Sequence, residues 1–187
     1  MIHEANTDEE RQEVLDFFLE TFDIAPNAVP MTNVDDLYAP IVLQYRDGAG
    51  QLQGGALTCR AQVAVGSVVA KKYGAPFPHQ DDYINVLDRH SELDLIKVAP
   101  DARGQGIGSQ MLAYLEKQLR SRGVRVWFGN VTQDLDIERL RGFYTSHQFT
   151  VLDPGQPLPP FFGRRWVPPN TMPPAFFFYK KLTNGTS

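Results

Sequence analysis

Apolar residues recur at helical spacing in three segments of the chain. The first covers residues 8–22 and follows Thr7, whose side chain is suited to the N-cap of a helix. The second begins near Ile107 and ends near Gly123, and the third begins at Ile137. These three segments are predicted to be helices.

Short runs rich in β-branched and aromatic residues predict the strands of a sheet. A turn sequence, Asp-Gly-Ala-Gly at 47–50, joins the first two strands into a hairpin. Two adjacent glycines, Gly54 and Gly55, mark a bulge or a close backbone approach in the second of them. The predicted strands cover residues 41–46, 52–60, 93–98, 124–131, 149–152 and 175–182.

Three stretches have less regular patterns. Residues 63–73 fit a helix or a strand. Their β-branched residues favour a strand, whereas the Ala-Lys-Lys ending favours a helix. Residues 81–90 are predicted as a short helix, and residues 153–174 as a long proline-rich loop. The resulting order of elements, αββ(α)βαβαββ, is typical of a mixed α/β sandwich. A chain of 187 residues is expected to form a single domain, residues 1–187.

Composition narrows the classes of protein. The net charge of −4 argues against a general electrostatic grip on nucleic acid. The single cysteine, Cys59, excludes an internal disulfide and fits a buried strand in a reducing compartment. There is no signal-peptide pattern and no apolar run long enough to span a membrane, so a cytoplasmic protein with no membrane partner is expected.

A glycine-rich loop carries the clearest functional signal. Residues 95–109 read Leu-Ile-Lys-Val-Ala-Pro-Asp-Ala-Arg-Gly-Gln-Gly-Ile-Gly-Ser, a strand followed by a loop and the start of a helix. Glycines allow close approach of a bulky anion, and free N–H groups at a helix start favour negative charge. The loop fits neither the Walker A motif nor the G-x-G-x-x-G fingerprint. It is therefore a candidate phosphate cradle of another kind.

The loop resembles the pyrophosphate loop of the GCN5-related N-acetyltransferase (GNAT) family, whose signature is Gln/Arg-x-x-Gly-x-Gly/Ala. The resemblance implies the acyl-CoA N-acyltransferase fold, a mixed and mostly antiparallel sheet with splayed middle strands and flanking helices. It also implies acetyl-CoA as co-substrate, bound between strands 93–98 and 124–131. From the spacing of the potential ligands, no metal is expected. The coenzyme-binding residues that the resemblance implies are Ile96, Lys97, Val98, Arg103, Gly104, Gln105, Gly106, Ile107, Gly108 and Ser109.

The second family signature lies at Phe143-Tyr144, followed four residues later by Gln148-Phe149. The resemblance implies that Tyr144 protonates the coenzyme A sulfur. Gln148 stands where the family has glycine, which removes the easy left-handed helix cap. Ile137 stands where the family often has asparagine. The alternative for Tyr144 is packing on a helix face.

Two carboxylates are candidates for the base. The resemblance to histone-type members points to Glu92, eleven residues before Arg103. Asp94 lies two residues on and shares its strand face, so each carboxylate favours a proton on the other. The pair could instead bind a cationic substrate, lie at a solvated strand start, or give way to a water relay.

Other polar residues carry weaker functional signals. His147 ends the helix of Tyr144 and is predicted to cap it. His79 and His90 lie near Asp81, Asp82 and Asp88, but their spacing fits no standard metal site. The loop at Arg164-Arg165-Trp166 is a candidate substrate lid or dimer contact, a packing element, or a nucleic-acid contact, in that order.

The sequence thus predicts a direct-transfer N-acetyltransferase for a primary amine, with a small cationic acceptor favoured. A protein or tRNA-bound amine remains open as acceptor, and a homodimer is compatible. The alternative is a non-catalytic acyl-CoA-binding regulatory module.

Overall fold

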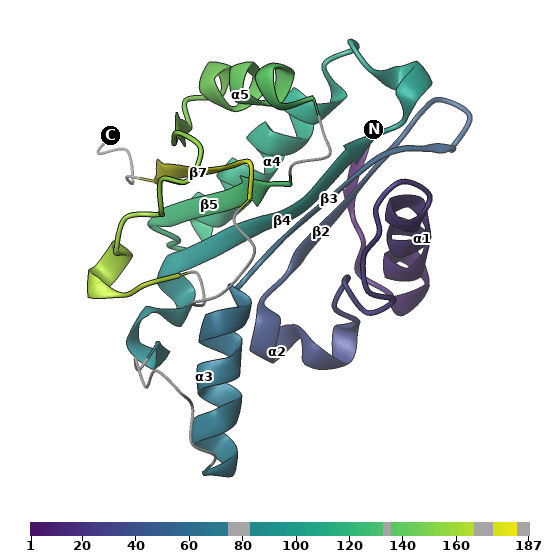
Figure 1. Cartoon of the computed structure of the whole chain (residues 1–187). Helices are drawn as coiled ribbons and strands as arrows, with labels where there is room; N and C mark the ends of the chain where they lie inside the picture. Colours follow the sequence, from purple (N-terminus) through teal and green to yellow (C-terminus); the bar gives the residue numbers. More distant parts are fainter. Residues whose placement is uncertain (75–82, 133–135, 167–173, 183–187) are drawn as a thin grey trace. The chain divides into compact units, whose positions relative to one another are not determined.

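A computed structural model describes residues 1–74, 83–132, 136–166 and 174–182 (Figure 1). The chain divides into two compact units. Unit 1 comprises Met1–Cys59 with Leu93–Gln118, and unit 2 comprises Arg60–Glu92 with Leu119–Ser187. The expectation of a single domain over residues 1–187 stays a prediction.

Unit 1 is built on a helix and an antiparallel hairpin. The first strand pairs with the second, and the second with the third, both antiparallel. The fourth strand and the fourth helix each run from one unit into the other. The elements are β1 (Ile2–Glu4), α1 (Asp8–Leu19), α2 (Asp35–Tyr38), β2 (Ile41–Arg46), β3 (Leu52–Cys59), β4 (His90–Val98) and α4 (Ile107–Ser121).

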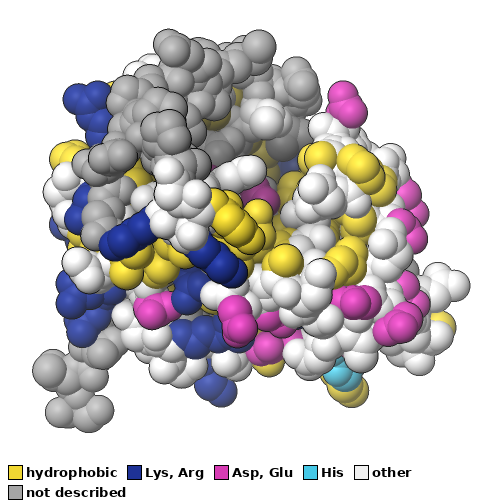
Figure 2. Space-filling model, turned by 90° about the horizontal axis from the view of Figure 1, so that it is seen from below, with side chains coloured by type: hydrophobic (Ala, Val, Ile, Leu, Met, Phe, Trp, Pro, Cys, Tyr) yellow, Lys and Arg dark blue, Asp and Glu magenta, His cyan; other side chains and the backbone are white. Residues whose placement is uncertain are grey.

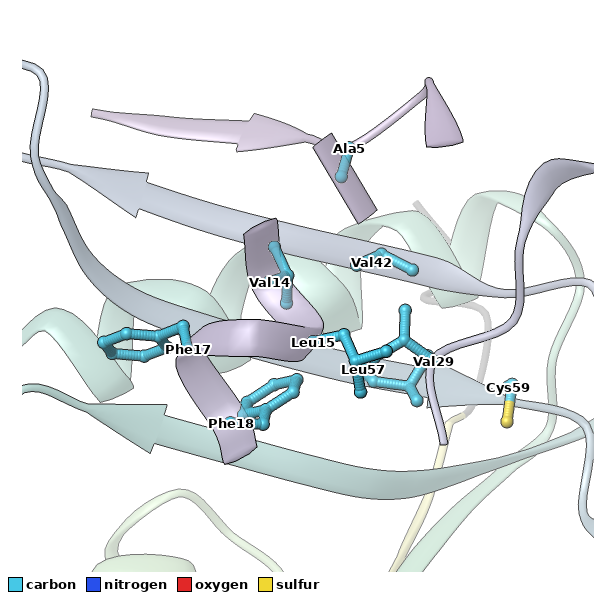
Figure 3. Close-up of a cluster of buried hydrophobic side chains, with 9 residues drawn as sticks. All are labelled: Ala5, Val14, Leu15, Phe17, Phe18, Val29, Val42, Leu57 and Cys59. Atoms are coloured by element: carbon cyan, nitrogen blue, oxygen red, sulfur yellow. The ribbon is translucent and has the colours of Figure 1, made fainter. Parts of the chain in front are cut away.

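Helix α1 supplies four of the nine members of one buried hydrophobic cluster of unit 1. Its start is a capping box, in which the Glu10 N–H donates to Thr7 Oγ1 at 3.2 Å and the Thr7 N–H donates to Glu10 Oε2 at 3.1 Å. Figure 3 shows Leu15 and Phe18 beside Leu57 of β3, within one cluster of buried side chains. The members of this cluster are Ala5, Val14, Leu15, Phe17, Phe18, Val29, Val42, Leu57 and Cys59.

Both features predicted as alternatives for Gly54 and Gly55, a bulge and a close approach, occur in β3. The register of β2 and β3 shifts between Tyr45 and Arg46, so Gln53 is an extra residue without a partner across the ladder. A Cβ on Gly54 would lie 3.1 Å from Ile107 Cγ2, and a Cβ on Gly55 would lie 3.2 Å from Val14 Cγ1. The strand therefore has a bulge and two close approaches, one on each face.

Unit 2 combines the remaining strands and helices. Strands β5 and β7 pair antiparallel along six residues, and β6 pairs antiparallel with β7. The elements are α3 (Gln62–Tyr73), a 3-10 helix (Ile84–Arg89), β5 (Val126–Val131), α5 (Ile137–Ser146), β6 (Thr150–Val151), a 3-10 helix (Phe161–Gly163) and β7 (Phe176–Lys181).

The fold class predicted from the sequence is confirmed as a mixed α/β fold with a mostly antiparallel sheet. Hydrogen bonds join its strands in the order β1-β2-β3-β4-β5-β7-β6, in which β4 belongs to both units. The splay of the middle strands stays a prediction. No helix in the described ranges is both long and apolar enough to cross a membrane.

Several predicted boundaries were wrong. Helix α1 ends at Leu19 rather than residue 22, and β4 begins at His90 rather than residue 93. The open choice at residues 63–73 resolves to helix α3. Strand β1 and helix α2 were not predicted, because three and four residues are too few to show a period.

Candidate functional site

The glycine loop begins where β4 ends and is open to solvent. A 3-10 turn at Pro100–Ala102 follows Val98 and leads into Gly104 and Gly106, whose φ angles are 80° and 76°. Such angles lie in the left-handed region, where a side chain costs about 1–2 kcal/mol. The backbone thus favours glycine at both positions, and Gly106 is also a glycine of the pyrophosphate-loop signature.

The geometry of the loop fits an anion. No heavy atom lies within 4 Å of the Cβ position of Gly104, and for Gly106 the nearest is Gln110 Nε2 at 4.0 Å. Arg103 and Gln105 are exposed, while Gly108 and Ser109 lie half-buried in the first turn of α4. The N–H groups of this first turn point toward an anion at the helix start and can bind a phosphate oxygen without help from a positively charged side chain.

Strand β4 carries the predicted carboxylates. Glu92 and Asp94 are both in the strand and share one face, together with Ile96 and Val98. This face is half-buried or exposed from Glu92 onward, whereas Leu93 and Lys97 of the other face are buried. The carboxylates and the approach to the glycine loop therefore follow one another along one strand face.

Lys97 serves the core of unit 1 with its side chain. Its Nζ donates to the carbonyl oxygen of Phe17 and, at 2.9 Å, to Glu20 Oε2. The ammonium group also lies 4.0 Å from the centre of the Phe17 ring. Lys97 thus ties the end of α1 to β4, and only its backbone is available for the coenzyme contact that the family resemblance implies.

Asp94 differs electrostatically from an ordinary surface carboxylate. Its side chain reaches solvent at the strand surface. Desolvation by the surrounding protein nevertheless raises the pKa of its carboxyl above the usual 3.8. A base with a raised pKa holds a proton more firmly after taking it from an ammonium group.

Tyr144 is held by a packed aromatic cluster of unit 2. Its ring stacks on Phe178 at 3.8 Å and meets Phe149 edge-on at 5.7 Å. The residue is buried, and desolvation raises the pKa of its phenol, so the hydroxyl keeps its proton at neutral pH. The hydroxyl makes no hydrogen bond within the described residues.

A Schellman motif fixes this tyrosine at the end of α5. The Phe149 N–H donates to the Tyr144 carbonyl at 3.1 Å, and the Gln148 N–H donates to the Thr145 carbonyl at 2.9 Å. Gln148 adopts φ 65°, the left-handed conformation that the motif requires. The motif therefore persists without its usual glycine, and its hydrophobic contact is the pair Tyr144 and Phe149.

His147 is the C-cap residue of this helix, as predicted. Its Nδ1 lies 2.7 Å from the carbonyl oxygen of Phe143, which also accepts a hydrogen bond from Ser146 Oγ at 2.8 Å. Lys180 of β7 donates to the His147 carbonyl at 3.1 Å. These contacts attach the end of α5 to the strand beneath it.

Sequence reasoning missed the role of His90. The Ala61 N–H donates to its Nε2 at 3.0 Å, and its Nδ1 lies 3.0 Å from the Val86 carbonyl oxygen. An imidazole placed between one donor and one acceptor is a neutral tautomer with hydrogen on Nδ1. Burial lowers the pKa of His90 to about 4. No local pattern marks this role, because the hydrogen-bond partner Ala61 lies 29 residues earlier in the chain.

His90 belongs to an aromatic cluster that includes part of the proline-rich loop. Trp166 is buried and lies 4.1 Å from the His90 ring, and Phe161 is buried beside Phe128. Packing is therefore a role of this loop, although a lid or dimer contact was favoured from the sequence; those roles and the nucleic-acid contact stay predictions. No three potential metal ligands gather within the described ranges, and His79, Asp81 and Asp82 lie outside them.

Comparison with known proteins bears on this geometry. A family model described as an acetyltransferase (GNAT) domain matches residues 60–151. The resemblance to the GNAT family is confirmed. No curated protein matches the sequence.

Solved GNAT structures share the fold over the full chain. A GNAT-family acetyltransferase from Staphylococcus aureus Mu50 has 14% identity and a TM-score of 0.62, over 98% of this chain and 100% of its own. An aminoglycoside 6'-N-acetyltransferase complexed with coenzyme A has 15% identity and a TM-score of 0.58, over 100% and 99%. A ribosomal-protein-alanine N-acetyltransferase from Brucella melitensis has 22% identity and a TM-score of 0.58, over 97% and 99%. At these identities the likeness concerns the fold.

We predict that Gln148→Gly stabilises the protein. Glycine relieves the left-handed strain at φ 65°, but it also makes the unfolded chain more flexible, which offsets part of the stabilisation. The net stabilisation should be about 0.5–1 kcal/mol. Urea unfolding measures the change. Thr145→Gly, at an exposed helical position, is the control and should destabilise. Equal effects of both substitutions would contradict the strained cap.

We predict a loss of stability at acid pH from His90. Because its folded pKa of about 4 lies below the unfolded value, the unfolded chain takes up the proton first as pH falls. Between pH 7 and pH 5 this removes about 2 kcal/mol of unfolding free energy. His90→Gln should flatten that dependence in urea titrations, whereas exposed His3→Gln should leave it unchanged. A pH slope retained in His90→Gln would overturn this account.

Proposed function

We propose that this protein is an acetyl-CoA-dependent N-acetyltransferase that transfers the acetyl group directly to a primary amine. The observation that carries the proposal is the sequence of strand, open glycine loop and helix start from Glu92 to Ser109. Two left-handed glycines and the first turn of α4 fit a pyrophosphate group, within a fold whose solved relatives include one complexed with coenzyme A.

In this proposal the coenzyme is held by the backbone of the loop and of β4. The N–H groups from Gly104 to Ser109 would bind the pyrophosphate, with Arg103 beside them. The backbone of Ile96, Lys97 and Val98 would bind the part of the coenzyme nearer the acetyl group. Bound there, acetyl-CoA supplies the activated acetyl group.

The chain's own side chains would handle the protons. An amine acceptor arrives as an ammonium ion and must lose a proton before it can attack. Glu92 or Asp94 would take that proton, and the raised pKa of Asp94 suits it to the task. Tyr144, protonated at neutral pH, would hold a proton for the departing thiolate.

Charge supports a cationic acceptor. Unit 1, to which Asp94 belongs, has 14 acidic and 5 basic residues, whereas unit 2 has 8 acidic and 13 basic residues. Figure 2 shows one face with acidic side chains along its right side and, in its lower middle, acidic and basic side chains next to each other. A surplus of negative charge in unit 1 attracts a small polyamine or aminoglycoside-like amine. A protein amine is the alternative acceptor for the same chemistry.

Amine-dependent release of free thiol tests the function, and Tyr144→Phe tests the acid. The variant should lower kcat by about a hundredfold and leave the acetyl-CoA Kd unchanged, because only a proton donor is lost. Tyr179→Phe, which removes a hydroxyl elsewhere in unit 2, should keep wild-type kcat. If no amine in a panel of polyamines, aminoglycosides and peptides releases thiol while acetyl-CoA binds, the protein is a coenzyme-binding module.

The pH profile identifies the base. Activity should fall as pH drops through the pKa of the base, because a protonated carboxyl cannot accept the ammonium proton. Substituting the base, by Glu92→Gln or Asp94→Asn, should lower kcat/KM by about a hundredfold and remove that acid limb. The exposed-carboxylate control Asp36→Asn should retain both. An unchanged acid limb in both site variants would assign the proton transfer to water.

A further inference from the structure

Both ends of the glycine loop contact strand β3. At the first end, the Ala99 N–H donates to the carbonyl oxygen of Gln53 at 2.9 Å, directly after β4 finishes. Gln53 is the bulged residue of β3, with no partner in the register with β2. The carbonyl of the bulged residue thus accepts a hydrogen bond from the first residue of the loop.

At the second end, Gly54 lies against the start of α4. Its Cβ, if it had one, would be 3.1 Å from Ile107 Cγ2, 3.2 Å from Met111 Cε and 3.4 Å from the Lys97 carbonyl oxygen. Ile107 is the first residue of the helix and is buried. The Lys97 carbonyl oxygen is a backbone atom, so it cannot move away from an added Cβ by a change of rotamer.

We infer that Gln53 and Gly54 form the seat of the coenzyme loop, and that Gly54 is a positioning residue for coenzyme binding. The inference rests on the proposed function. Residues 99 and 107 bracket the loop, and the same dipeptide of a neighbouring strand fixes both. Holding a loop in its binding conformation before the ligand arrives raises affinity, because less ordering remains to be done on binding.

Gly55 provides a matched comparison on the opposite strand face. A Cβ there would meet Val14 Cγ1 at 3.2 Å and Phe18 Cζ at 3.3 Å, a crowding similar to that at Gly54. Those atoms belong to α1, which is remote in sequence from the loop. Gly54→Ala and Gly55→Ala therefore introduce the same group into similarly tight sites, and only one of them presses on the loop.

The experiment compares acetyl-CoA binding and kinetics in both variants of the full chain. Gly54→Ala should raise the Kd and the KM for acetyl-CoA about tenfold and leave kcat at saturating coenzyme unchanged. Both variants should lower the melting temperature to a similar extent, and Gly55→Ala should change the Kd for acetyl-CoA by less than about twofold. Equal effects of the two variants on Kd would overturn the inference, since crowding alone would then explain them.

A second pair of variants covers the case in which Gly54→Ala does not fold. Ile107→Ala removes the side chain that rests on Gly54, and Val14→Ala removes the one that rests on Gly55. Ile107→Ala should weaken acetyl-CoA binding about tenfold, and Val14→Ala should leave it unchanged. Wild-type affinity in Ile107→Ala overturns the seat. A wild-type protein that binds no acetyl-CoA overturns the proposed function itself.

Discussion

The close approach of β3 to β4 and α4 is the constraint on which the architecture of unit 1 depends. Glycine at position 54 lets the helix start lie against the strand, and glycine at position 55 lets α1 lie against its other face. The strand can then be covered on both sides by elements that bring bulky side chains, Ile107 and Met111 on one face and Val14 and Phe18 on the other. A core packed at this density cannot absorb an added methyl group without a shift of backbone or rotamer.

A second constraint acts in unit 2, where local strain is offset by packing. Gln148 takes a backbone conformation that glycine would take more easily, yet the Schellman hydrogen bonds form around it. The rings of Tyr144, Phe149 and Phe178 pack together beneath the same turn. Aromatic contacts of this kind outweigh the cost of one left-handed residue. The orientation of Tyr144 is thus set by the helix end and the strand together.

Local sequence patterns predicted most of the fold because most elements are longer than one period. The helix starting at Ile107 and the strand at Ile41–Arg46 begin where their patterns begin. The glycine loop was also readable, because left-handed glycines leave a direct mark in sequence. His90 was not, since its partners Ala61 and Trp166 lie 29 and 76 residues away and only the folded chain brings them together. Lys97 was similarly read only through its backbone, because its partners Phe17 and Glu20 lie about 80 residues earlier.

The most direct test of the account is calorimetric titration of the purified protein with acetyl-CoA, alongside Gly106→Glu and with NAD as control ligand. The account predicts micromolar binding of acetyl-CoA by the wild-type protein and none of NAD. It also predicts loss of acetyl-CoA binding in Gly106→Glu, because a side chain at φ 76° strains the loop and its charge repels the pyrophosphate. Absence of acetyl-CoA binding by the wild-type protein, or equal binding by Gly106→Glu, would contradict it and leave the glycine loop as a structural turn.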